Sequence, residues 1–121
     1  MTEEPSRTSA LASRHSALGS GLEDWNGMGT AWTYNTDPND EHDAVRERAG
    51  MFDMSPLKKV FVRGPDAQAV LDHLTTRDLS KVTPGKAAYL CVLNDQGGIA
   101  DDAIVSNNGG DEWMIVHGSG D

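Results

Sequence analysis

The side chains best suited to chemistry in this sequence are two adjacent carboxylates, Asp101 and Asp102. They follow the Gly97-Gly98 pair and lie in a stretch whose composition predicts a strand over residues 99–105. Successive strand residues point to opposite faces, and each acid shares its face with apolar neighbours. One carboxylate must therefore lie beside buried aliphatic surface, where it needs a donor partner or a cavity. The alternative is that one acid is solvated and the other sits at the strand end.

Tyr89 and His117 are the other candidates for this site. The turn over residues 94–98 predicts a hairpin that brings Tyr89 near the far end of the acid-bearing strand, although an ordinary strand tyrosine is the simpler interpretation. The four histidines show no metal-ligand spacing, so no metal site is expected, and only His117, at a strand end, is kept as a site residue. Cys91 is expected to be a small buried hydrophobe.

Two helices are marked by their end signals. Asp37 is a capping acid and Pro38 suits the first helical position, which predicts a helix over residues 38–49. A second helix is predicted after residues 64–66. Its core-facing stripe has the spacing i, i+3, i+4 and i+7, at Ala67, Val70, Leu71 and Leu74.

Four strands are predicted, over residues 59–63, 87–93, 99–105 and 113–117. In the first, Val60 and Val62 are expected to face inward. Residues 87–93 are apolar on both parities, which is typical of a central strand. The order of helices and strands indicates an α+β fold, a mainly antiparallel sheet with two short helices.

Composition and charge indicate how the chain is divided and which classes of function are disfavoured. The chain has 121 residues and a formal net charge of -9. The first 30 residues are rich in Ser, Gly, Ala and Thr, which predicts a mobile tail over residues 1–36 and a folded domain over residues 37–121. The acidic balance argues against nucleic-acid binding. No run approaches the ~20 apolar residues of a membrane span and no export signal is visible, so we expect a cytoplasmic protein that does not enter membranes.

Six segments, in order and at compatible spacings over residues 41–117, together resemble the N-terminal region of the glycine-cleavage T-protein family. They are EHDAVR (41–46), GMFDMS (50–55), VRGPDA (62–67), LTTRDLS (74–80), PGKAAY (84–89) and GGIADD (97–102). The T-proteins are tetrahydrofolate-dependent aminomethyltransferases. Their relatives include folate-dependent demethylases, such as dimethylsulfoniopropionate demethylase, and the folate domains of sarcosine and dimethylglycine dehydrogenases.

The resemblance implies a central folate cavity built from three subdomains, of which this chain would supply an incomplete first part. Asp102 matches the family's essential carboxylate, which faces the pterin and helps to activate the folate nitrogen. Tyr89 matches a folate-lining tyrosine. Asp101 and His117 are expected to support the same tetrahydrofolate site. The partners implied are a small-molecule one-carbon donor or a lipoyl carrier protein, together with the missing C-terminal portion or a partner chain.

Departures from the T-protein pattern refine the hypothesis. Met54-Ser55 runs into Pro56, Ser106 stands where tyrosine is common, and a strand end that usually reads Val-Asn-Ala has His117. The segment TRDLSK (76–81) and the pattern of Ser119 and Asp121 lean toward the demethylase relatives. The sequence thus predicts a tetrahydrofolate-dependent one-carbon transferase, moving a methyl or aminomethyl group. The alternative is a non-catalytic folate-binding regulatory protein related to iron–sulfur assembly factors.

Overall fold

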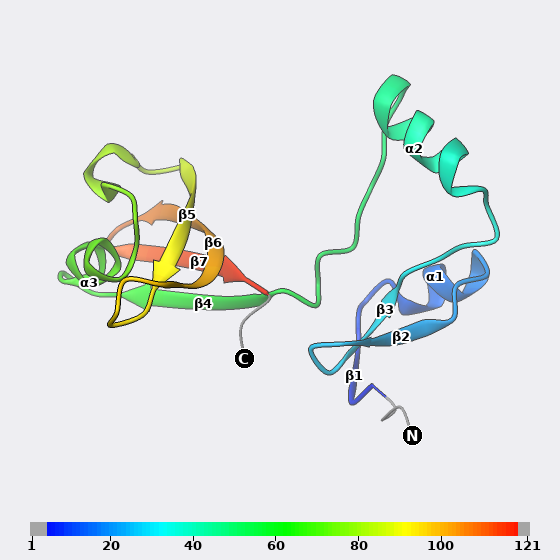
Figure 1. The fold of residues 1–121 in the computed structure, drawn as a ribbon, viewed down its shortest axis with the longest axis horizontal. Coiled ribbons are helices and arrows are strands. Elements are labelled where there is room, and N and C mark those ends of the chain that lie inside the picture. Colours follow the sequence, from blue (N-terminus) through cyan, green and yellow to red (C-terminus); the bar gives the residue numbers. More distant parts are fainter. Residues whose placement is uncertain (1–4, 119–121) are drawn as a thin grey trace. The chain divides into compact units, whose positions relative to one another are not determined.

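The chain folds into two compact units, Met1–Pro56 and Leu57–Asp121, in a computed structural model that describes residues 5–118 (Figure 1). Each unit has its own sheet. The boundary between the units therefore falls after Pro56, where the sequence had placed it after residue 36.

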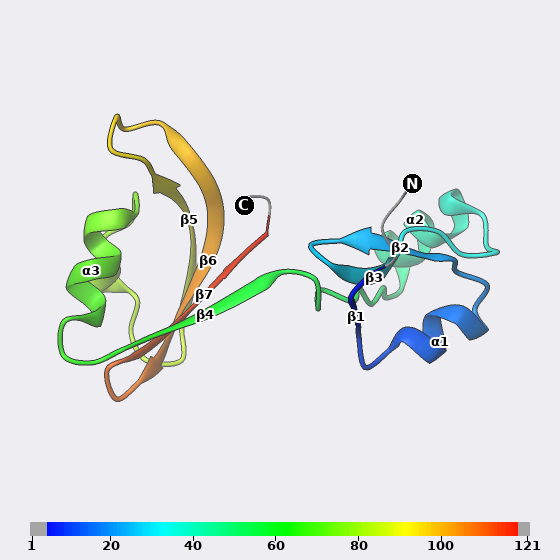
Figure 2. The same cartoon turned by 90° about the horizontal axis from the view of Figure 1, so that it is seen from below.

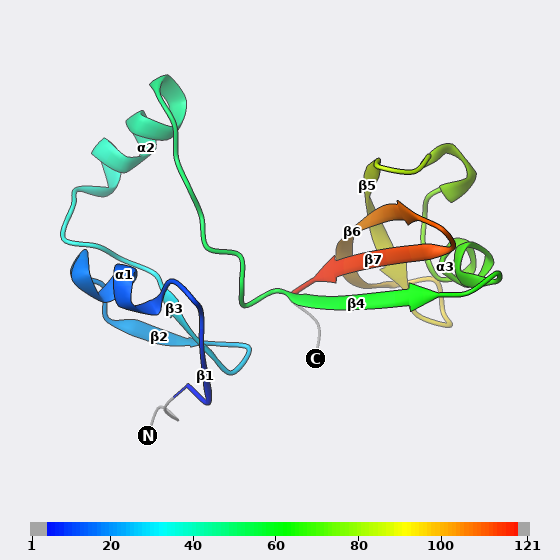
Figure 3. The same ribbon diagram turned by 180° about the vertical axis from the view of Figure 1, so that it is seen from behind.

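The first unit is a three-stranded sheet with two helices (Figure 3). Its strands are β1 (Arg7–Thr8), β2 (Leu22–Trp25) and β3 (Met28–Ala31), and its helices are α1 (Ala12–Ala17) and α2 (Pro38–Glu47). β3 is central, parallel to β1 and antiparallel to β2. The predicted helix over residues 38–49 is confirmed as α2, and Asp37 caps it by accepting a hydrogen bond from the Asn39 N–H.

The structure differs from the tail predicted over residues 1–36, since β1, α1, β2 and β3 all lie within that range; residues 1–4 are outside the described part. Asn26 and Gly27 form the β2–β3 turn, with φ of 54° and 74°. Asn-Gly between two short strands is a strong hairpin signal, which the composition of this segment does not reveal. Trp25 and Trp32 then pack with ring centroids 5.3 Å apart.

A polar cluster centred on Asp53 ties separate segments of the first unit together. Asp53 Oδ2 accepts hydrogen bonds from the Ser9 hydroxyl at 2.5 Å and from His15 Nε2 at 2.9 Å. Asp53 Oδ1 accepts from the Ser55 hydroxyl, and the other ring nitrogen of His15 lies 2.8 Å from the Tyr34 hydroxyl. Burial raises the pKa of the Asp53 carboxyl, but these hydrogen bonds, the one from Ser55 foremost, outweigh burial and hold that pKa well below its usual range.

The second unit is a four-stranded antiparallel sheet with the order β4-β7-β6-β5 (Figure 1). The strands are β4 (Lys58–Arg63), β5 (Ala87–Leu93), β6 (Ile99–Gly109) and β7 (Glu112–His117), and the helices are α3 (Ala67–Leu74) and the short 3-10 helix η1 (Leu79–Lys81). All four predicted strands and the second predicted helix are present, with β6 extending beyond its predicted end. The α+β class is confirmed.

Helix α3 covers one face of this sheet (Figure 2). Of its predicted stripe, Ala67 and Leu71 are buried, whereas Val70 and Leu74 are 48% and 44% exposed. The core that they join is a cluster of buried apolar residues from α3, η1 and the strands: Ala67, Leu71, Leu79, Val82, Leu90, Ala103, Val105 and Trp113. On β4 only Val62 packs against this cluster. Val60 lies on the same face, opposite Ile115, as predicted, but it is 45% exposed and does not join the cluster.

Strand β5 was predicted to be central, but it lies at one edge of the described sheet. Its outer edge is partly protected by the segment before it. Cys91 N donates to the Thr76 hydroxyl, and Thr76 N donates to the Cys91 carbonyl, both at 3.1 Å. The apolar residues on both parities of β5 follow from two different environments, since Leu90 is in the core and Tyr89 is 60% exposed on the other face.

Replacing Leu79, which is fully buried, tests this core. We expect Leu79→Ala to lower the free energy of unfolding of the second unit by about 2–5 kcal/mol, because it leaves a cavity. Denaturant unfolding measures the change. Ile99→Ala is the matched control, since Ile99 is 69% exposed and its truncation should cost less than about 0.5 kcal/mol. Equal losses would contradict the core described above.

The Asp53 cluster should make the first unit sensitive to acid. Because the folded pKa of Asp53 is lowered, its stabilisation is present above the unfolded value of about 3.9 and is lost as pH falls through the folded pKa. Asp53→Asn should remove this acid dependence and lower stability at neutral pH by about 1–3 kcal/mol. Fluorescence of Trp25 and Trp32 in a Trp113→Phe background would follow the first unit, with the exposed Glu23→Gln as control.

Candidate functional site

Strand β6 carries the two adjacent acids to opposite faces of the sheet. Asp101 is 9% exposed and shares its face with the buried Ala103 and Val105. Asp102 is exposed and shares its face with Ile104, which is 48% exposed. The expectation that one carboxylate lies beside buried aliphatic surface is therefore confirmed, and that carboxylate is Asp101.

The exposed carboxylate is paired with Tyr89. The Tyr89 hydroxyl donates to Asp102 Oδ2 at 2.5 Å. Tyr89 faces Ile104 in the β5–β6 register and Cys91 faces Asp102, so the tyrosine reaches the acid diagonally across the ladder. The proximity predicted from the hairpin is thus confirmed. The hydrogen bond to Asp102, followed by the repulsion from its negative charge, raises the pKa of the Tyr89 hydroxyl.

The buried carboxylate is held by contacts of its own among the described residues. His117 Nδ1 lies 3.0 Å from Asp101 Oδ2, and the backbone N–H of Asp102 donates to Asp101 Oδ1 at 2.8 Å. His117 faces Ala103 in the β6–β7 register, so it lies on the same side of the sheet as Asp101. The four residues predicted for the site therefore form two pairs. Asp102 and Tyr89 lie on one face, and Asp101 and His117 on the face that α3 covers.

We call the face opposite α3 the open face. It includes Phe61, Tyr89, Asp102, Ile104, Met114 and Val116, which are joined by cross-strand pairing of Phe61 with Met114 and of Ile104 with Val116. Lys59 and Cys91 share this face, opposite Val116 and Asp102. Phe61, Tyr89 and Ile104 are each about half exposed or more. The sequence reasoning did not assign Phe61, Met114 or Val116 to this surface. The available signal was their parity, because each alternates with a residue that points to the core.

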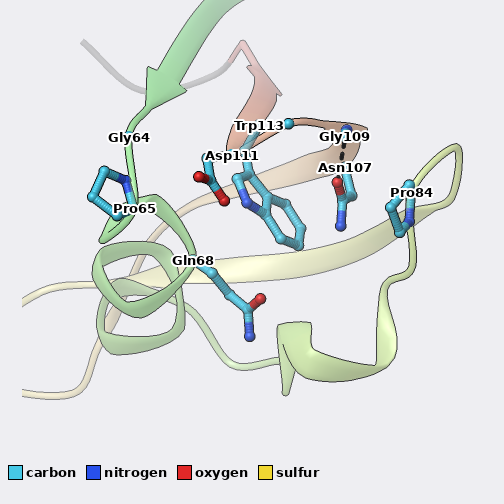
Figure 4. Close-up of a pocket in the computed structure, with 9 residues that line it drawn as sticks. Gly64, Pro65, Gln68, Pro84, Asn107, Gly109, Asp111 and Trp113 are labelled. Atoms are coloured by element: carbon cyan, nitrogen blue, oxygen red, sulfur yellow. Dashed lines mark hydrogen bonds between the residues drawn. The ribbon is translucent and has the colours of Figure 1, made fainter.

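Cavities lie beside the sheet, and the two best defined among the described residues are not lined by Asp102 or Tyr89. One, of about 190 Å³, lies where α3 begins, beside the β6–β7 turn (Figure 4). Gln68, Asn107, Asp111 and Trp113 are among its lining residues, and it is at the end of β6 far from Asp102. The Asp102–Tyr89 pair thus belongs to an exposed surface within this chain.

Among residues 5–118, no three His, Cys, Asp or Glu side chains are grouped so that they could hold a metal ion. Within the same range, the helices are too short or too polar to cross a membrane.

Comparison with known protein families identifies the fold. The family model described as the GCVT N-terminal domain matches residues 11–121. The chain belongs to this family. The resemblance inferred from the six sequence segments is thereby confirmed, and the match begins within the range that was predicted to be a tail.

The relatives of this GCVT N-terminal domain include an N-demethylase subunit and aminomethyltransferases. The gamma subunit of a heme-dependent oxidative N-demethylase from Ectopseudomonas mendocina is 56% identical over 94% of this chain and 30% of its own length. An aminomethyltransferase from Bordetella petrii is 46% identical over 88% of this chain and 29% of its own. The chain therefore spans about 30% of the length of these curated relatives.

A solved structure also matches the domain. The glycine cleavage system aminomethyltransferase T from Bartonella henselae has a TM-score of 0.82 and 30% sequence identity, covering 93% of this chain and 31% of the other. The relatives and this structure support a folate-related one-carbon transferase family.

The Asp102–Tyr89 pair predicts a specific titration. Tyr34→Phe leaves Tyr89 as the remaining tyrosine, so the ultraviolet absorbance of tyrosinate then reports Tyr89 directly. In that background Asp102→Asn should lower the Tyr89 pKa toward its ordinary value, because it removes the charge that disfavours the phenolate. Asp95→Asn, in the exposed hairpin loop, should leave the titration unchanged. An unchanged Tyr89 pKa in Asp102→Asn would show that the pair does not form.

Proposed function

We propose that this chain is the first part of a tetrahydrofolate-dependent one-carbon transferase, in which Asp102 faces the folate nitrogen and Tyr89 lines the same site. The observation that carries the proposal is the Asp102–Tyr89 hydrogen bond on the open face of a GCVT N-terminal domain. The remaining walls of the site would come from the rest of the protein, in the same or a partner chain, because the relatives are about three times longer.

The open face suits a flat heteroaromatic ring that carries N–H donors. Phe61 and Ile104 offer exposed apolar surface on either side of β7, and Asp102 offers a negatively charged acceptor within it. Ligand sites commonly combine apolar walls with a few polar groups that fix orientation. When bound, tetrahydrofolate would supply a nucleophilic ring nitrogen that accepts the one-carbon unit.

Asp102 would orient the ring and hold a proton. The Tyr89 hydroxyl occupies Oδ2, and no hydrogen-bond partner among residues 5–118 occupies Oδ1. Oδ1 is therefore available to accept a hydrogen bond from a ligand N–H or to take its proton as a general base. A phenol is protonated at neutral pH, so Tyr89 is a donor to the carboxylate there, and the direction of its pKa shift, upward, agrees with this role.

For the donor, we infer an N-methyl amine rather than a lipoyl-bound aminomethyl group. The similarity to a subunit named for oxidative N-demethylation supports this choice, as do the departures from the T-protein pattern at Met54 and His117. The partners would then be the source of the oxidised methyl group and the polypeptide that completes the cavity. A cytoplasmic location is part of the proposal and agrees with a single cysteine.

Titration of the ¹⁵N-labelled chain with tetrahydrofolate, followed by NMR, tests the folate site. Weak binding is expected, because the chain would supply only one wall. Shifts should concentrate on open-face residues such as Tyr89, Asp102 and Ile104. Asp102→Asn should weaken binding by roughly tenfold or more, since a hydrogen bond to a charged group contributes about 1.5–3 kcal/mol.

Asp95→Asn serves as the matched control, because it removes an exposed carboxylate from the loop between β5 and β6 without touching the open face. Its titration should match that of the unmodified chain. Shifts centred on another surface, or equal affinity in Asp102→Asn, would contradict the proposal. Specific binding together with loss of Asp102 dependence would favour a folate-binding protein without one-carbon chemistry.

A further inference from the structure

In the part of the chain that the structure describes, the β6–β7 pairing begins at Ala103 with His117, and β5 is the strand paired with the segment that carries Asp102. The β5–β6 register also shifts between Val92 and Leu93, directly opposite this segment. Such irregularities disrupt the ladder locally and often re-aim a side chain. Asp102 thus lies between the register shift of the β5–β6 pair and the first described β6–β7 pair.

At this point the Asp101 carboxylate contacts the backbone of Asp102. Its Oδ1 accepts the backbone N–H of Asp102 at 2.8 Å, and its Oδ2 lies 3.0 Å from His117 Nδ1. The Asp101 side chain is 8% exposed and that of His117 is 24% exposed, so water screens the contact only partly. The bond from Nδ1 to the carboxylate requires a proton on Nδ1 and orients the imidazole ring.

We propose that the buried Asp101–His117 pair is a positioning device that holds Asp102 against Tyr89 on the opposite face of the sheet. His117 fixes the rotamer of Asp101, Asp101 fixes the Asp102 backbone N–H, and the orientation of that peptide sets the direction of the Asp102 carboxylate. Both members of the pair are positioning residues, since they lie on the face covered by α3. Their importance for one-carbon transfer rests on the proposed function, whereas their geometric effect does not.

The Tyr89 titration provides a readout that needs no folate. In the Tyr34→Phe chain, His117→Phe keeps an aromatic ring of similar shape but removes the donor to Asp101. We expect it to shift the Tyr89 pKa downward, toward the value in Asp102→Asn. The substitution removes a hydrogen-bond donor from the face opposite Tyr89, so such a shift reports the position of the Asp102 carboxylate.

Rescue and control variants separate positioning from general damage. His117→Asn places an amide N–H near the position of Nδ1 and should restore the Tyr89 titration of the parent chain. His73→Phe makes the same substitution at an exposed histidine of α3 and should have no effect. His117→Ala is made in parallel, so that the test does not depend on whether the larger ring is accommodated.

A folded His117 variant with an unchanged Tyr89 titration, alongside a lowered pKa in Asp102→Asn, would overturn the positioning role. So would failure of His117→Asn to restore the titration. Circular dichroism establishes that each variant is folded. Because the measurement contains no ligand, this result is independent of whether the chain binds tetrahydrofolate, and either proposal can fail while the other stands.

Discussion

The two-residue alternation of β6 is the constraint on which the candidate site depends. A strand directs successive side chains to opposite faces, so adjacent acids cannot share an environment. In this chain the alternation places Asp101 in the core beside His117 and Asp102 on the open face beside Tyr89. A shift of one residue in the pairing of β6 would bury Asp102 and expose Asp101.

The packing of the second unit enforces that register. Ala103 and Val105 alternate with Asp102 and Ile104, and both buried residues belong to the cluster covered by α3. Exposing Val105 in order to bury Ile104 would lose this packing. The hydrophobic core and the chemistry of the site are thus consequences of the same arrangement, and the buried acid is tolerated because it has two hydrogen-bond donors.

The first unit is stabilised in a different way. Its short strands contain few apolar residues, and a polar cluster around Asp53 joins Ser9, His15 and Ser55. Within the GCVT N-terminal domain family, the chain thus combines a polar, hydrogen-bonded unit with an apolar-cored sheet. The open face of that sheet is one wall of the proposed folate site, in agreement with a chain that spans about 30% of its relatives.

The sequence by itself determined the helices and strands of the second unit, the α+β class, the family, and the opposite orientation of Asp101 and Asp102. These follow from local periodicity, end signals and segment order, which are properties of near neighbours in the chain. Only the tertiary structure decided which acid is buried, that His117 pairs with Asp101, and that β5 lies at an edge. It also showed that residues 7–31 form strands and a helix. Those outcomes depend on contacts such as His15 with Asp53 and His117 with Asp101, between residues far apart in sequence, which composition does not reveal.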